Sequence, residues 1–108
     1  MSEYTSGSVQ LLFVTSRTSG IGRRMESIVA TLEARNRGRA SIRKVYIDAE
    51  PELAERLGIR VIPTVVFLQG GRLTASLRGR ATLDELERAL EACEMIPGAL
   101  PGERHRER

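Results

Sequence analysis

Two strand-like runs joined by a Gly-Gly pair constrain the fold of this 108-residue chain more than any other feature. Residues 64–68 (TVVFL) and 73–77 (LTASL) are rich in apolar and β-branched side chains, and only residues 69–72 (QGGR) lie between them. Such runs around two glycines predict an antiparallel β-hairpin, because the central residues of a tight hairpin turn adopt positive φ. The second half of the chain is therefore expected to form an antiparallel edge of a sheet.

The first half of the chain predicts two strands joined by a helix. Residues 9–15 (VQLLFVT) form a short, nearly continuous apolar run, which is typical of a buried strand. A second strand is indicated around residues 42–47 (IRKVYI). Between the two runs, apolar side chains recur at the spacing of one helix face, at Ile21, Met25, Ile28, Val29 and Leu32. Because a strand-helix-strand crossover brings the second strand back beside the first, the two strands are expected to pair in parallel.

Two further helices complete the pattern. A short helix is predicted over residues 50–57, with Pro51 in its first turn and Gly58 after its end. Thr82 and Glu85 form a capping box for the last helix, whose inner face is expected to consist of Leu83, Leu86, Leu90 and Cys93. The element order β-α-β-α-β-β-α predicts an α/β sandwich in which a mixed four-stranded sheet is flanked by helices.

Length and composition predict one globular domain. A chain of 12.0 kDa buries about two-thirds of its unfolded surface, which is enough for a core without metals or disulfides. We expect the domain to span residues 9–94, between a disordered N-terminus at residues 1–8 and a flexible charged tail at residues 95–108. No aliphatic or aromatic run exceeds four residues, and the first residues do not resemble a targeting signal. A cytoplasmic protein without membrane contact is therefore expected.

One cysteine and one histidine limit the chemistry of the chain. An intrachain disulfide, a Cys-x-x-Cys motif and a cysteine zinc cluster are excluded, and no metal or cofactor is predicted. Cys93 lies on the apolar face of the last predicted helix, so we expect a small buried core residue. A reactive or metal-binding thiol is the alternative.

Positive charge is concentrated in the first half of the chain. Residues 17–44 carry eight bases and two acids, a net charge of +6, whereas the rest of the chain has nine bases and twelve acids. Such a segment can attract an anion or a nucleic acid, or it can be a solvated helix face. The chain has only four aromatic side chains for stacking on bases, so a nucleic-acid partner is not favoured.

Residues 46–71 (YIDAEPELAERLGIRVIPTVVFLQGG) resemble the segment of the thioredoxin family that runs from a parallel strand through a cis-proline into a hairpin. The resemblance extends over roughly residues 9–93 and implies a thioredoxin-like fold. It implies that Pro63 is the cis-proline facing the active site and that Gly79 lies on the same face.

The resemblance breaks down at the active-site motif. Alignment back from Pro63 without gaps places Phe13 at the family's buried acid and Thr18 at its tryptophan, while Lys44 matches a family lysine. The Cys-Gly-Pro-Cys motif is replaced by Ser19, Gly20, Ile21 and Gly22. Dithiol exchange needs one attacking and one resolving thiolate. The replacements therefore imply a protein without this catalysis, and no catalytic residue is predicted.

The resemblance also implies a place for a partner. In the family, the backbone just before the cis-proline pairs with an extended substrate segment, and Ile62 occupies that position. Strand addition of this kind needs no cysteine. Ser19 is also expected to cap a helix whose N-terminus favours an anion. We therefore predict a protein or extended peptide, acidic in character, bound by Thr18, Ser19, Ile62, Pro63, Arg17, Arg60 and Arg80.

Other functions stay open at this point. One is a thiol-disulfide oxidoreductase-related or glutathione-linked enzyme with a non-standard active site; another is anion or nucleic-acid binding through residues 17–44. Residues 15–22 (TSRTSGIG) resemble the dinucleotide-binding turn of short-chain dehydrogenases, but Ser16 replaces its first glycine. No lysine follows either tyrosine four residues on, as that family's catalytic pair requires. A weaker resemblance to circadian KaiB-type domains gives a precedent for a binding role.

Overall fold

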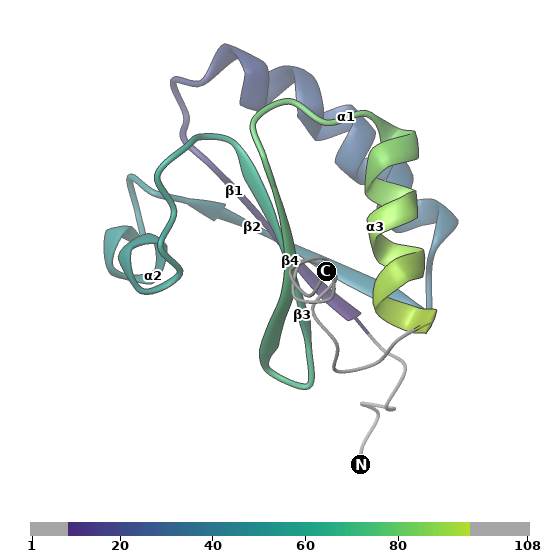
Figure 1. Ribbon diagram of the computed structural model, residues 1–108. Coiled ribbons are helices and arrows are strands. Elements are labelled where there is room, and N and C mark those ends of the chain that lie inside the picture. Colours follow the sequence, from purple (N-terminus) through teal and green to yellow (C-terminus); the bar gives the residue numbers. More distant parts are fainter. Residues whose placement is uncertain (1–8, 96–108) are drawn as a thin grey trace, which may run out of the picture.

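A computed structural model describes residues 9–95 of the chain and contains the predicted order β-α-β-α-β-β-α. The four strands form one sheet in the order β2-β1-β3-β4 (Figure 1). The central pair consists of β1 (Val9–Thr15) and β3 (Thr64–Gln69), which run antiparallel. At the edges, β2 (Ala40–Tyr46) pairs in parallel with β1, and β4 (Arg72–Arg78) pairs antiparallel with β3. The mixed four-stranded sheet is therefore confirmed.

The predicted terminal segments fall almost wholly beyond the part of the chain that the structure describes. The disordered N-terminus expected at residues 1–8 and residues 96–108 of the expected tail lie outside the described residues. Met95, which the sequence assigned to the tail, is the last residue of the final helix. Within residues 9–95, no helix combines the length and the apolar character needed to cross a membrane.

The helices cover the two faces of the sheet unequally (Figure 1). The long helices α1 (Gly20–Arg35) and α3 (Leu83–Met95) cover one face, where their apolar side chains pack with Leu11, Phe13 and Phe67 of the sheet. The six-residue helix α2 (Pro51–Arg56) lies on the other face. The core there is smaller, because its buried members are only Leu12, Val14, Val45 and Val66.

The turn and cap predictions are confirmed in detail. Gly70 and Gly71 both have positive φ, at 62° and 80°, as a two-residue hairpin turn requires. At the start of α3, the Thr82 N–H donates to Glu85 Oε1 at 2.9 Å, and the Glu85 N–H donates to Thr82 Oγ1 at 3.1 Å. Both hydrogen bonds of a capping box are thus present, so this helix begins where the sequence predicts.

Cys93 is fully buried in the larger core cluster, as expected. Its Sγ lies 3.2 Å from the hydroxyl oxygen of Thr74, and the Thr74 hydroxyl itself donates to the Phe67 carbonyl at 3.1 Å. The thiol can therefore donate to the Thr74 oxygen, and a serine hydroxyl at this position would have the same partner.

We predict that Cys93 reacts slowly with Ellman's reagent in the native protein and rapidly in denaturant. Cys93→Ser should lower the free energy of unfolding by about 1 kcal/mol, because the new hydroxyl is buried but can bond to Thr74. Thiol labelling kinetics and urea unfolding measure the two effects. Native-state labelling as fast as labelling in denaturant would contradict the buried position.

Candidate functional site

Three segments leave the sheet side by side at one edge. Thr64, the first residue of β3, pairs with Val14 near the end of β1 and with Arg78 at the end of β4. The backbone N–H of Gly79 then donates to the Pro63 carbonyl at 2.7 Å. The chain after β1, before β3 and after β4 therefore meets here. We call this edge, formed by residues 16–19, 61–63 and 79–80, the Pro63 edge.

Ile62 presents unpaired backbone groups at the Pro63 edge. The Ile62–Pro63 peptide bond is cis, and the Pro63 side chain is buried. The Thr64 hydroxyl donates to the Val61 carbonyl at 2.6 Å, and the Pro63 carbonyl accepts from Gly79. Between these two bonded carbonyls, the N–H and C=O of Ile62 form no hydrogen bond with another residue among those described, 9–95. A donor and an acceptor on the same residue are what an added strand requires.

Ser19 begins helix α1 and uses its hydroxyl to do so. Its Oγ accepts the Gly22 N–H at 2.9 Å, which is the N-cap interaction that the sequence predicts. Its backbone is occupied as well, because the Ser19 carbonyl accepts from the Arg23 N–H at 3.0 Å and the Ser19 N–H donates to the Ser16 carbonyl at 3.2 Å. Thr18 is exposed beside it, with its hydroxyl 3.1 Å from that of Ser16.

Gly22 has no room for a side chain. It is buried, and a Cβ built on it would overlap the Thr15 hydroxyl oxygen and come within 3.2 Å of the Ser19 side chain. Thr15 is itself fully buried at the end of β1, so its hydroxyl has little freedom to move away. Gly20, in contrast, faces open space, with nothing within 4 Å of its Cβ position. The sequence shows two glycines here, and only the structure distinguishes them.

The structure gives each of the three predicted site arginines a different neighbour. The Arg17 guanidinium lies 4.8 Å from the Tyr46 ring centroid, and the Arg17 N–H donates to Asp48 Oδ2 at 3.2 Å. Arg60 lines a hollow on the face of the sheet that carries α2. Arg80 directly follows Gly79 and is exposed, so it is the arginine that the chain connectivity places beside Pro63.

The basic segment at residues 17–44 is not one uninterrupted positive surface. Ion pairs join Arg35 to Glu87 at 3.2 Å, Arg43 to Glu50 at 2.7 Å and Lys44 to Glu26 at 3.9 Å. Glu87 and Glu50 lie outside the segment and neutralise part of its charge excess, whereas Glu26 is one of its own two acids. Among residues 9–95, no group of three or more His, Cys, Asp or Glu side chains is placed to hold a metal ion.

Comparison with known proteins decides the family. The thioredoxin family model matches residues 7–92 of the chain. The chain belongs to the thioredoxin family. Within that family it is 40% identical over 55 residues to thioredoxin-1 of Drosophila melanogaster, and the aligned residues make up 51% of each chain. It is 33% identical over 69 residues to the chloroplastic thioredoxin M4 of Arabidopsis thaliana, and the aligned residues make up 64% of this chain and 36% of the relative.

The aligned part is thus about half or less of the length of these relatives, and only 20% of an uncharacterised Mycobacterium tuberculosis protein that is 33% identical over 61 residues. Solved structures agree on the fold. The crystal structure of the germline-specific thioredoxin Deadhead from Drosophila melanogaster superposes with a TM-score of 0.69 at 29% identity and covers 83% of each chain. A malarial protein structure superposes with a TM-score of 0.73 at 18% identity.

This thioredoxin-family chain holds Ser19 and Gly22 where the resemblance places the two cysteines, and both residues serve the start of α1. Sequence reasoning found these positions but missed Thr15, whose hydroxyl fills the space beside Gly22. The only signal in the sequence was a glycine in the first turn of a helix, where glycine costs stability relative to alanine unless space is short.

We predict that Gly22→Ala lowers the free energy of unfolding by about 1–3 kcal/mol, because the added methyl group overlaps Thr15. Gly20→Ala is the matched control, and it should be neutral or slightly stabilising because alanine favours helix and the site is open. Urea unfolding measures both. A double-mutant cycle with Thr15→Ala should show that the cost of Gly22→Ala falls once the hydroxyl is gone. Equal costs at the two glycines would contradict the steric account.

Proposed function

We propose that this thioredoxin-family chain binds an extended segment of a partner protein at the Pro63 edge and does not catalyse dithiol exchange. The observation that carries the proposal is the pair of free backbone groups on Ile62, next to the buried Pro63 and at an open edge of the structure. An extended peptide can bond to both groups, so that its affinity depends on main-chain hydrogen bonds and its specificity on neighbouring side chains.

The position of the sulfur supports the absence of dithiol chemistry. Exchange proceeds by attack of one thiolate and resolution by a second. The chain contains a single cysteine, Cys93, and that residue is fully buried in the core under α3. At the Pro63 edge, Ser19 caps a helix and Gly22 has no space for a thiol-bearing side chain.

The side chains around Ile62 favour a partner segment that is both apolar and acidic. Ile21 and Val61 belong to the few large hydrophobic residues that remain exposed, at 37% and 40%, and they flank Ser19 and Ile62 in sequence. Arg80 adds a positive charge beside Pro63. Charge complementarity of this kind acts mainly on encounter rate and specificity, so an acidic segment is selected without large gains in affinity.

For redox activity, we predict that the unaltered protein does not reduce insulin disulfides in the presence of dithiothreitol beyond the rate without protein. The double variant Ser19→Cys, Gly22→Cys should also not reduce insulin, or should fold poorly, because there is no room for a Cβ at residue 22. Adding Thr15→Ala to that variant should restore measurable reduction, since a helix N-terminus lowers the pKa of a thiol. Insulin reduction by the unaltered protein that survives Cys93→Ser would rule out the proposal.

For partner binding, we predict that Ile62→Pro abolishes binding and Ile62→Ala does not. Proline removes the backbone N–H, whereas alanine shortens the same half-buried side chain but keeps the donor. The partner is first isolated by affinity capture on the unaltered protein and then titrated in its purified form against each variant by calorimetry. Thermal unfolding checks that both variants are folded.

The same titration by backbone-amide NMR locates the site. Shifts are expected at Ser19, Ile62 and Gly79, and Arg80→Ala should reduce the dependence of affinity on salt concentration. Equal binding by Ile62→Pro and Ile62→Ala, or shifts restricted to the opposite edge of the sheet, would show that the Pro63 edge is inherited architecture and not the binding site.

A further inference from the structure

The face of the sheet that carries α2 is left partly uncovered. On the other face, α1 and α3 contribute 16 and 13 residues, whereas α2 contributes six. Figure 1 shows α2 displaced toward one side, away from the β3–β4 hairpin. Leu73 of β4 is 47% exposed, the most exposed large hydrophobic side chain among residues 9–93. A single exposed leucine is ordinary on a protein surface, so the significance of Leu73 depends on the side chains around it.

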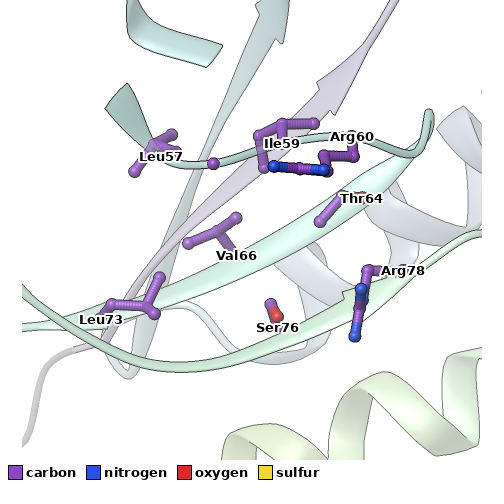
Figure 2. Close-up of a pocket in the computed structure, with 9 residues that line it drawn as sticks. Leu57, Ile59, Arg60, Thr64, Val66, Leu73, Ser76 and Arg78 are labelled. Atoms are coloured by element: carbon purple, nitrogen blue, oxygen red, sulfur yellow. The ribbon is translucent and has the colours of Figure 1, made fainter. Parts of the chain in front are cut away.

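A hollow runs along this face between the segment after α2 and strand β4 (Figure 2). Apolar and basic side chains both line it. Leu57 and Leu73 lie at one end, Arg78 lies toward the other end with Ser76 between Leu73 and Arg78 along β4, and Arg60 lies beside Ile59 on the side opposite Arg78. We call this feature the α2–β4 hollow. It is an amphipathic surface that combines apolar side chains with two arginines.

The two arginines of the α2–β4 hollow have no acidic side chain beside them in its lining. No aspartate or glutamate lines the hollow. Within residues 9–95, neither Arg60 nor Arg78 has an ion-pair partner, whereas Arg35 and Arg43 do. Two guanidinium groups that line one hollow without a counter-charge attract a carboxylate.

We infer that the α2–β4 hollow docks an acidic, amphipathic segment of a partner protein, with apolar side chains against Leu57 and Leu73 and a carboxylate held by Arg60 and Arg78. This surface adjoins the Pro63 edge, because Thr64 pairs with Arg78 there, but it uses side chains on the face that carries α2 instead of the backbone groups of Ile62. A second copy of this chain does not fit, because a two-fold contact uses the same surface on both copies, and the lining of the hollow has two arginines and no carboxylate to pair with them. The chain's own ends do not fit either, since residues 1–8 contain one acid and residues 96–108 contain two acids against three arginines.

The first test uses 8-anilinonaphthalene-1-sulfonate, a fluorescent probe that joins apolar rings to one sulfonate. The probe should bind to the hollow, and its binding should shift the backbone-amide NMR signals of Val66, Leu73 and Ser76. Arg78→Ala should weaken binding about fivefold and Leu73→Asp about tenfold, because each removes one half of the amphipathic surface. Arg24→Ala, an exposed arginine on α1, is the matched control and should have no effect. Leu73 and Arg78 are both exposed, so their variants are expected to fold. Thermal unfolding checks this.

The second test separates an acidic partner from any apolar one. Two 12-residue peptides carry leucine at the same positions and either glutamate or lysine at the others. The glutamate peptide should displace the probe from the unaltered protein and much less from Arg78→Ala, and the lysine peptide should not displace it. Equal displacement by both peptides, no displacement by either, or probe shifts confined to Ser19 and Ile62 would overturn the inference. The Ile62→Pro variant tests partner binding at the Pro63 edge only, whereas the probe and the peptides test the α2–β4 hollow. A negative result for one proposal can therefore be distinguished from a negative result for the other.

Discussion

The pairing of β1 on both of its sides holds the rest of the structure in place. β1 lies between the parallel strand β2 and the antiparallel strand β3, and its successive residues Phe13 and Val14 are fully buried on opposite faces of the sheet. Because β1 runs opposite to β3, the end of one strand lies beside the start of the other. The loop that begins α1 and the backbone of Ile62 are brought together by this geometry alone.

Three of the residues that depart from the thioredoxin-family pattern stabilise the fold locally. The resemblance places Phe13 at the family's buried acid, and Phe13 contributes a fully buried aromatic ring where a charged group would be costly to bury. Ser19 caps α1, and Gly22 allows that helix to approach Thr15 closely. Packing and helix capping therefore explain the side chains at these three positions, where dithiol exchange would need other side chains. The proposed binding role assumes a fold that persists after a catalytic function is lost.

The fold could be predicted from the sequence because its signals are local. The Gly70–Gly71 turn, the Thr82 capping box and the Ser19 cap each depend on residues within a few positions of one another, and the structure has all three. The candidate site was harder to predict from the sequence, because the placement of its side chains depends on contacts between segments that are distant in the chain. Arg17 stacks on Tyr46, and Arg60 turns out to share a hollow with Arg78. Neither neighbour has a sequence signal, because both arise from the pairing of strands and the path of the α2–β3 connection.

Hydrogen–deuterium exchange of the Ile62 amide, measured by NMR with and without the isolated partner, tests the central claim most directly. In the free protein the Ile62 N–H has no hydrogen-bond acceptor among residues 9–95, so its exchange should be fast. In the complex, an added strand would hold this proton in a hydrogen bond, and we expect its exchange to slow by at least about tenfold. A complex in which the Ile62 amide exchanges as fast as in the free protein would contradict strand addition at the Pro63 edge.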